Sequence, residues 1–552
     1  MTKNMVQLMC CLFISACTGI IDESVESEKE TLWQNYLKNS SQERVLMDFS
    51  HAGVNFSDSA IPELALPIFD VTSYGAVADD GIEDKDAIQR TINAAEKAGG
   101  GIVQLPAGRF LVNEMPGQRA GLRVSSSNVI LRGSQNDSRQ TELFMEHHLE
   151  PVVAEQLWTV PAMITFQPAN SQALTSNSAK RQYSFHTQII ENSAANSEYV
   201  TVLNAEQFQI GDMVTFEMED PAANNEYLHG KPVRGIWQRI NTKGVMVAES
   251  HQIKKISGNR LYFMRPTLTR INVDYGWKIG KVPSITNVGI EKISFKGNFN
   301  EKFKHHKNYI HDSGFSAVKL IRTSHSWVRN CKFTDVSYAV TVEGGMANSV
   351  LLNSIEGNSG HGSFTVSFGT RNLVGLNIDT SSEGQWHGPG ASHLSVGNVF
   401  WKFYSPTSRG IDAHSVFPRH TLFDAITSHG FGGWGGSYAT LPNHLEGLVF
   451  WNFTQLGSAV SKGNEDNIDF WNLPESDSEK YGFLTAVNPI LVGYRGSATS
   501  INENNLLKLE SVNQHVTPSS LFEAQLNHRL GTTPDWLIES IEQWQILKNR
   551  RH

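Results

Sequence analysis

The fold is decided by residues 69–112, which read FDVTSYGAVADDGIEDKDAIQRTINAAEKAGGGIVQLPAGRFLV. The pattern predicts, in order, a strand at 69–71, a helix at 85–98 and strands at 102–105 and 110–112. Four residues share one face of that helix at helical spacing: Ile88, Thr91, Ile92 and Ala95. Three glycines at 99–101 end the helix, because glycine readily adopts the left-handed backbone that closes a helix.

Further along the chain, short strand-like runs recur at the spacing of a solenoid coil. They start near residues 326, 348, 371, 393, 420 and 444, so successive starts differ by 22, 23, 22, 27 and 24 residues. Each run alternates apolar and polar residues and is followed by Asn, Gly or Ser at a turn. A repeat of this length is typical of stacked coils, in which each unit buries its apolar face against its neighbours. The period predicts an all-β chain wound as a parallel β-helix.

The stretch at 69–112 is similar to the N-terminal signature of the pectate-lyase-like superfamily, which holds rhamnogalacturonases and epimerase-like proteins. The resemblance implies a right-handed parallel β-helix with its first coil capped by the helix. It leaves the reaction open, because lyases, hydrolases, epimerases and phage tailspikes share this signature.

Departures from the period divide the chain into predicted parts. The solenoid is expected over 46–475, with a β-rich insertion at about 170–275 and a lengthened coil at 301–313. Residues 476–552 are expected to form a C-terminal capping segment. Its helix carries four large apolar residues on one face, and we expect it to close the open end of the solenoid: Leu537, Ile541, Trp544 and Leu547.

The N-terminal residues are typical of a secreted, lipid-anchored protein. Lys3 precedes an apolar run of about a dozen residues, which is too short to span a bilayer and suits a signal peptide. The run ends in Ile-Ser-Ala-Cys, which resembles a bacterial lipobox, so we expect residues 1–17 to be a lipoprotein signal with Cys17 lipidated. Residues 18–45 would form a tether. The expected location is the cell envelope, as an outer-membrane lipoprotein facing the periplasm or the surface; an ordinary cleaved signal peptide is the alternative.

Composition narrows the classes of partner. The net charge of the 552 residues is −9 and no run rich in Lys or Arg occurs, which argues against a nucleic-acid partner. Aromatic residues make up 10% of the chain, including 12 tryptophans, which suits stacking on sugars as well as core packing. Of the four cysteines, only Cys331 lies beyond the signal region, so no intrachain disulfide is expected.

Histidines gather in the middle coils. Eleven of the 20 histidines lie between residues 300 and 450. Equivalent positions of adjacent coils lie about 4.8 Å apart, so side chains far apart in sequence converge when they share a register. His361, His387 and His414 lie in or beside glycine-rich loops, where functional groups concentrate.

Histidines beside arginines favour β-elimination on a uronate. That reaction needs a cation on the carboxylate, a base for the C5 proton and an acid for the leaving oxygen. Arg409 or Arg419 is the expected carboxylate clamp and His414 the base, with His387 or His361 as the acid. Additional substrate contacts are expected from three residues: Lys307, His311 and Trp434. The substrate would be an acidic poly- or oligosaccharide.

A second resemblance agrees with a carbohydrate substrate. Three elements are similar to a group of uncharacterised β-helix proteins of polysaccharide-degrading bacteria: HHKxxxHDxG at 305–314, Asp-Ala-His at 412–414 with its following Pro-Arg, and PNH…WNF at 442–453. It carries no settled mechanism. The group eliminated is either a sugar, which makes a lyase, or water from a terminal uronate, which makes an oligosaccharide dehydratase.

Two other functions stay open. A glycoside hydrolase needs two opposed carboxyls, for which the candidates are Asp379, Asp412 and Asp424. Of the polygalacturonase motifs, only Gly-His-Gly is matched, at 360–362, which weakens that alternative. A non-catalytic glycan-binding lipoprotein would use exposed tryptophans, with four candidates: Trp386, Trp401, Trp434 and Trp451.

Metal binding is a further expectation. Calcium is a candidate ligand because pectate-lyase relatives often carry it, and the available carboxylates are Asp379, Glu383 and Asp412. Zinc on the histidines has less support from the sequence, because no pair shows the i, i+4 spacing of helical zinc ligands.

Overall fold

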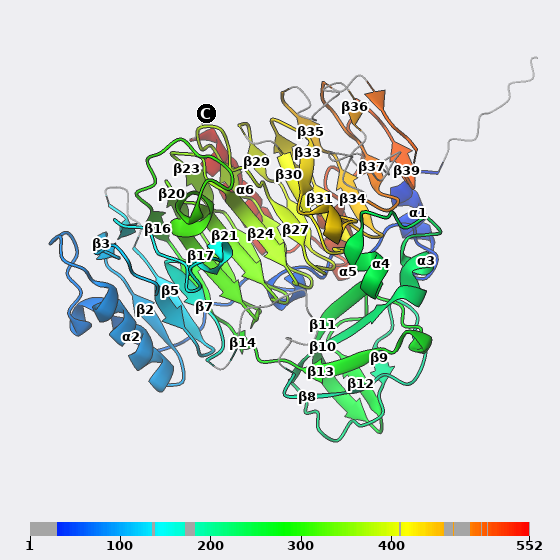
Figure 1. Ribbon diagram of the computed structural model, residues 1–552, viewed down its shortest axis with the longest axis horizontal. Coiled ribbons are helices and arrows are strands. Elements are labelled where there is room, and N and C mark those ends of the chain that lie inside the picture. The colour runs from blue at the N-terminus through cyan, green and yellow to red at the C-terminus, as the bar shows by residue number, and fades with distance from the viewer. Residues whose placement is uncertain are drawn as a thin grey trace, which may run out of the picture.

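The predicted fold class is confirmed by a computed structural model, in which three long parallel sheets wind into a β-helix (Figure 1). The structure describes residues 30–134, 139–169, 171, 183–407, 410–457, 467–468, 486–497, 500–504 and 506–550. Within these residues, no helix combines the length and the apolar character needed to cross a bilayer.

The longest sheet has 12 strands among the described residues. Its order is β1 (Ile68–Asp70), β2 (Gly101–Gln104), β5 (Val129–Arg132), β15 (Gly289–Glu291), β19 (Trp327–Arg329), β22 (Ser349–Leu351), β25 (Leu373–Gly375), β28 (Val399–Trp401), β31 (Thr421–Asp424), β34 (Leu448–Trp451), β37 (Ile490–Val492) and β39 (Lys508–Glu510). The runs from β19 to β34 are the strands that the 22- to 27-residue period predicts.

Two further sheets complete the described coils. The nine-stranded sheet has the order β3 (Gly108–Val112), β6 (Thr141–Met145), β16 (Ile293–Lys296), β20 (Lys332–Thr334), β23 (Ser354–Glu356), β26 (Ile378–Asp379), β29 (Tyr404–Ser405), β32 (Thr427–Ser428) and β35 (Thr454–Gln455). The eight-stranded sheet has the order β33 (Gly432–Gly435), β30 (Gly410–His414), β27 (Gly390–Ser392), β24 (Gly362–Ser367), β21 (Tyr338–Glu343), β17 (Ser316–Ile321), β7 (Ile164–Phe166) and β4 (Leu122–Val124).

The first coil forms as the opening stretch predicts. Helix α2 spans Lys85–Lys97 at one end of the stack (Figure 1), and its predicted apolar face is buried. Gly99 and Gly100 follow the helix, both at positive φ, and a Cβ at Gly100 would meet the backbone of Asn128 at 2.7 Å. These glycines let β2 approach its neighbouring coil closely.

Inside the coils, side chains stack along the axis of the solenoid. Phe400, Phe423 and Phe450 form one aromatic row, with ring centroids 5.1 and 5.4 Å apart. At a corner of the coils, buried asparagines form a ladder in which the Asn348 amide donates to Asn372 at 3.0 Å and the Asn372 amide donates to Asn398 at 2.9 Å. Each rung also binds backbone groups that the turn would otherwise leave unsatisfied.

We expect Asn372→Ala to lower the free energy of unfolding by about 2–4 kcal/mol, because buried donors and acceptors on both neighbouring rungs lose their partner. Urea unfolding followed by tryptophan fluorescence and by circular dichroism measures the change. The exposed Asn549→Ala is the matched control, with an expected effect within about 0.5 kcal/mol. Equal midpoints for the two variants would show that the ladder adds no stability.

The insertion between β7 and β14 (Ile285–Thr286) folds as an antiparallel sheet beside the solenoid (Figure 1). Its order is β8 (Phe185–Gln188), β13 (Lys278–Lys281), β10 (Met213–Asp220), β11 (Val245–Ser257), β12 (Arg260–Phe263) and β9 (Tyr199–Thr201), with the short helices α3 (Asn224–Tyr227) and α4 (Gln238–Lys243). Its core is continuous with Phe417 and Leu441 of the coils, so it packs on the solenoid as one body.

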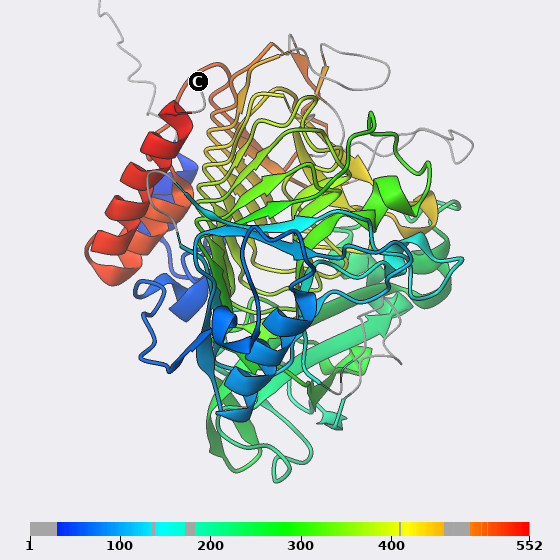
Figure 2. The ribbon, with the colours of Figure 1, turned by 90° about the vertical axis from the view of Figure 1, so that its left-hand side faces the viewer.

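The C-terminal helices do not close the end of the solenoid, which corrects the sequence prediction. Helices α5 (Leu521–Leu530) and α6 (Asp535–Asn549) lie along the side of the coils (Figure 2). Leu526 and Leu537 pack against Trp401 and Trp451, whose side chains project outward from the 12-stranded sheet. The outer face of that sheet is apolar, and this surface rather than the open end is what the helices bury.

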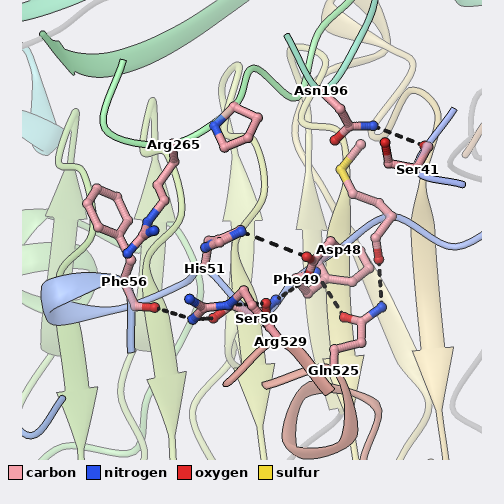
Figure 3. A network of polar contacts seen from close by, with 12 residues as sticks. Ser41, Asp48, Phe49, Ser50, His51, Phe56, Asn196, Arg265, Gln525 and Arg529 are labelled. Carbon is pink, nitrogen blue, oxygen red and sulfur yellow. Dashed lines mark hydrogen bonds and ion pairs between the residues drawn. The ribbon is translucent and has the colours of Figure 1, made fainter. Parts of the chain in front are cut away.

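An N-terminal segment fastens these parts together (Figure 3). It follows α1 (Leu32–Lys38) and runs between α5 and the insertion. Gln525 accepts from the backbone of Phe49 at 2.9 Å, and Arg529 donates to Ser50 at 2.8 Å and to Asp58 at 2.5 Å. Arg265 of the insertion also contacts Asp58, so one carboxylate joins the insertion to the C-terminal helix.

A histidine and carboxylate cluster as the candidate active site

A group of titratable side chains lies across adjacent inner strands of the eight-stranded sheet, from β30 to β21. Asp412 and His414 belong to β30, and in the adjacent coil they stand in register with Gly390 and Ser392 of β27. His387 precedes β27 and forms a bridge with Gly362, the first residue of β24. Parallel pairing in register therefore brings residues from successive coils to one place, as the predicted stacking requires.

Asp412 joins two of these histidines. Its Oδ2 lies 3.1 Å from Nδ1 of His387 and 3.1 Å from Nδ1 of His414. These contacts assign the proton of each neutral ring to Nδ1. Nε2 of each ring therefore carries the lone pair. The Asp412 side chain is 9% exposed, whereas the His414 side chain is 27% exposed. His414 is thus oriented by a buried partner and stays accessible.

The carboxylate of Asp412 and the imidazole of His414 each favour the charged form of the other. Burial disfavours the ionised form of Asp412, but His414 and His387 outweigh it and hold the pKa of Asp412 well below its usual range. Burial also opposes the charged form of His414, yet the Asp412 carboxylate raises the pKa of that imidazole. His414 is therefore a stronger base than an ordinary histidine.

His361 has the opposite character. Its Nδ1 donates to the backbone carbonyl of Asp312 at 2.8 Å, and its buried Nε2 has no hydrogen-bond partner among the described residues. Burial, together with the nearby His387, holds the pKa of His361 well below its usual range. His361 is a neutral imidazole with an unused lone pair.

Tyr338, which the sequence analysis missed, completes the row. Its ring lies 5.1 Å from that of His361, and Gly362 permits this approach because a Cβ there would collide with the tyrosine ring. Burial, with Asp412 and Asp312, raises the pKa of Tyr338, so its hydroxyl keeps its proton. The signal that could have found it is the period: Tyr338 precedes His361 by 23 residues, one coil.

The lengthened coil lies over the cluster and supplies more histidines. His305 stacks on Trp386 with ring centroids 4.7 Å apart, and it lies 5.1 Å from His361 and 5.5 Å from His387. Burial, with His306 and His387, lowers the pKa of His305 to about 4. A sequence signal existed in the His-His-Lys run at 305–307, but it does not show where the loop lies.

Contacts within that loop fix its path. Asp312 accepts from the backbone of His306 at 2.9 Å and contacts the ring of His306 at 2.8 Å. His311 is fully buried, accepts from the backbone of Lys304 at 3.1 Å and donates to Glu301 at 3.2 Å. The structure therefore gives His311 a place in the support of the loop, where no face of its ring is open to a substrate.

The other predicted site residues fall into three groups. Lys307 is exposed and pairs with Glu301 at 2.5 Å within the lengthened coil. Arg419 is away from the cluster: it is fully buried, donates to the carbonyl of Ala248 at 3.3 Å and lies 3.9 Å from Glu249 of the insertion. A guanidinium without exposed surface cannot clamp a substrate, so Arg419 is corrected to a residue that joins the solenoid to the insertion. The third group lies outside the described residues and comprises Arg409, Cys17 and the side chain of Trp434.

The predicted calcium ligands do not converge. Asp379 is buried and accepts from Ser381 and Gln385, Glu383 pairs with Lys302 at 2.9 Å, and Asp412 pairs with histidines. In the part of the chain that the structure describes, the groups of three ligand-type side chains near one point are instead His305–His361–His387, His306–Asp312–His361 and His387–Asp412–His414. These donor sets are rich in imidazole, which suits transition metals better than calcium.

A strip of polar residues crosses the same sheet from the cluster. Register places Asp412, Gly390, Thr365, Thr341 and Lys319 side by side on five adjacent strands. We call these residues the polar strip. At about 4.8 Å per strand, Lys319 lies roughly 19 Å from Asp412. An extended chain of several sugars matches that length.

Comparison with known proteins finds sequence similarity over short stretches of the chain. The sequence model of a family described as a domain of unknown function (DUF4955) matches residues 384–540. Alginate lyase 7 of Azotobacter vinelandii is 41% identical over 66 residues, which are 12% of this chain and 8% of that protein. Mannuronan C5-epimerase AlgE1 of the same organism is 34% identical over 95 residues, 17% of this chain and 7% of that protein. The chain thus spans less than a tenth of these relatives.

Solved structures match over more of the chain and at low identity. A mutant DFA-IIIase from Arthrobacter chlorophenolicus A6, solved in complex with DFA-III, is 11% identical with a TM-score of 0.40, and the match covers 85% of this chain and 90% of that one. An exopolygalacturonase from Thermotoga maritima is 11% identical with a TM-score of 0.34, covering 84% and 88%.

Proposed function

We propose that the protein is a carbohydrate-active enzyme that acts on a uronate-containing poly- or oligosaccharide by β-elimination. The observation that carries the proposal is the Asp412 carboxylate that orients His414, with His361 and Tyr338 two and three coils away on the same sheet. The short similarities to an alginate lyase and to mannuronan epimerases, whose names denote uronate substrates, agree with this substrate class.

The proposed reaction transfers two protons and breaks the C5–H and C4–O bonds of the uronate. Nε2 of His414 removes the proton at C5 of the uronate, and the released electron pair forms the C4–C5 double bond while the C4–O bond breaks. The departing oxygen takes a proton from the Tyr338 hydroxyl, which its raised pKa keeps protonated. If that oxygen belongs to a sugar, the chain is cleaved; if it is a hydroxyl, water leaves.

Lys319 supports an acidic, extended substrate. It is a cation on the polar strip, four strands from Asp412, where it can meet the carboxylate of a distant sugar. Its ammonium is held by the carbonyl of Val160 at 2.9 Å. The reacting sugar itself needs a closer cation, and Arg409, predicted for that role, lies outside the described residues.

The two alternative functions have less support from the described geometry. The carboxyls proposed for hydrolysis lie in three different sheets, and Asp424 accepts three hydrogen bonds from the start of α5. Burial raises the pKa of Asp379 and of Asp424, as a hydrolase acid requires, but both side chains are fully buried and neither reaches a substrate beside Asp412. For a glycan-binding protein, Trp401 and Trp451 are fully buried and offer no face to a sugar.

Anchoring at the cell envelope is part of the same proposal. An acylated Cys17 would hold the enzyme at the outer membrane, where it meets polysaccharide from outside the cell. Growth with labelled palmitate followed by isolation of the protein tests it, because Cys17→Ser would lose the label.

Incubation with a panel of uronate glycans tests the reaction. We expect a new ultraviolet absorbance from the unsaturated uronate, with mass spectrometry showing either unsaturated fragments or loss of one water from an uncleaved oligosaccharide. New reducing ends without the chromophore would contradict elimination in favour of hydrolysis. Binding of a glycan without any new product would support the non-catalytic alternative.

A further inference from the structure

Three histidines from separate parts of the chain converge on one point. One ring nitrogen from each of His305, His361 and His387 lies within 4.8 Å of the others. His305 comes from the lengthened coil, and the other two come from successive coils of the solenoid. The rings therefore surround a point that no single coil could build.

The second nitrogens of two of these rings are already occupied. Nδ1 of His361 donates to a backbone carbonyl at 2.8 Å, and Nδ1 of His387 lies 3.1 Å from the Asp412 carboxylate. A histidine that binds a metal through one nitrogen almost always donates its other N–H to a carbonyl or a carboxylate. Both rings show that arrangement, which leaves Nε2 as the lone pair in each.

An independent observation concerns buried polar atoms without partners. Nε2 of His361 and Nε2 of His305 are buried and have no hydrogen bond within the described residues. His361 is 8% exposed, so water does not readily satisfy its lone pair. Buried nitrogens are rarely left in this state, and either an ordered water or a bound ion would complete them.

The geometry points to a binding site for a divalent transition metal ion of the zinc type, held by His305, His361 and His387. Three neutral imidazoles with a fourth open position are the donor set of catalytic zinc sites, and nitrogen ligands select against calcium and magnesium. Ring nitrogens on one tetrahedral ion lie about 3.3 Å apart, so the rings must close by roughly an ångström. His305 lies on a loop and can make that movement.

The two overlapping groups fit a metal less well. In His306–Asp312–His361, the His306 side chain is 64% exposed and its Nδ1 already contacts Asp312. In His387–Asp412–His414, the carboxylate is shared by two ring N–H groups and serves as their acceptor. Of the three groups, the one of His305, His361 and His387 is the one in which two buried ring nitrogens have lone pairs without a hydrogen-bond partner among the described residues.

A metal ion at this site would supply the cation that the proposed elimination needs beside the carboxylate of the reacting sugar. This role rests on the proposed function: an ion on His387, whose ring lies 5.1 Å from that of His414, would bind the uronate carboxylate and lower the barrier to removing the C5 proton. The binding site itself does not depend on that reaction, because it follows from the side chains alone.

Metal binding to the full-length protein tests the site. The protein is stripped with a chelator, dialysed and titrated with Zn²⁺ by calorimetry and with Co²⁺ by visible absorbance. We expect one ion per chain, an intense tetrahedral Co²⁺ spectrum and binding weakened by at least about tenfold in His305→Ala and His361→Ala. His186→Ala, at an exposed histidine of the insertion, is the matched control and should bind as the unaltered chain does.

The outcomes separate the site from the reaction. Binding that is absent, or equal in His305→Ala, His361→Ala and His186→Ala, would overturn the site. Binding lost as expected, with elimination unchanged after chelation, would keep the site and overturn its catalytic role. Absence of elimination on every glycan, with stoichiometric metal bound, would refute the proposed function and leave the site standing.

Discussion

Replacing His414 with glutamine is expected to lower kcat/KM for elimination by about 10²- to 10⁴-fold, the usual contribution of a general base. Glutamine keeps a polar side chain of similar length and can still contact Asp412, but it has no lone pair of comparable basicity. Because the change removes a group that acts in the transition state, kcat should fall far more than KM rises. Initial rates of formation of the unsaturated product measure both.

A matched variant separates this effect from a general loss of structure. His186→Gln alters an exposed histidine of the insertion and should keep full activity. His186→Gln should unfold at the midpoint of the unaltered chain. His414→Gln should unfold somewhat earlier, because the buried Asp412 carboxylate loses one of its two imidazole partners, so rates are compared without denaturant. An active His414→Gln protein would remove this residue from the mechanism and move the role of base to another group of the cluster.

The sequence could predict part of this cluster because the coils are regular. His361, His387 and His414 are 26 and 27 residues apart, close to the period of the strand-like runs. In parallel strands that pair in register, residues one coil apart become neighbours about 4.8 Å away. The fold class and the approach of His387 to His361 therefore follow from spacing, as does α2, whose apolar residues recur at helical intervals. The contact of His414 with His387 does not, because His414 stands in register with Ser392.

Other features depend on contacts that spacing does not encode. The position of His305 over the cluster is fixed by the stacking on Trp386 and by the folding of its loop around Asp312 and His311. Arg419 is only five residues from His414, yet it faces the insertion, because the turn between β30 and β31 separates their directions. Sequence proximity was the wrong guide there.

The backbone conformations of the turns could not be predicted from the sequence either. Leu352 and Leu376 adopt φ of 60° and 55° directly after strands of the 12-stranded sheet, a left-handed backbone that leucine seldom takes. Stacking of successive coils imposes it, since the same corner recurs in each coil with whatever residue the sequence supplies. The helices α5 and α6 are a similar case. The sequence predicts an apolar face on the C-terminal helix, but the place where the helices pack is decided by the apolar outer face of the 12-stranded sheet.

Asp412→Asn is expected to cause the second large loss, about 10²- to 10⁴-fold in kcat, although Asp412 is buried and touches no sugar in the proposed mechanism. An amide has nearly the same shape as the carboxylate, so the position of the ring is kept. Its NH₂ group, however, can donate to Nδ1 of His414, which then carries its proton on Nε2 and cannot act as a base. KM should change little, and product formation under saturating substrate measures the loss.

Asp379→Asn is the matched control, because Asp379 is also a buried carboxylate with several hydrogen bonds but belongs to the nine-stranded sheet. We expect it to change stability rather than kcat.

Asp412 also contacts His387, so the same loss could arise through the proposed metal site. Excess Zn²⁺ separates the two causes, because a metal ligand weakened by the loss of its carboxylate partner is restored by mass action, whereas a histidine with its proton on the wrong nitrogen is not. Activity that stays low in excess Zn²⁺ assigns Asp412 to the orientation of His414. Full recovery of activity would show that Asp412 acts through the metal ligand His387. It would contradict the proposal that Asp412 orients His414 as the base.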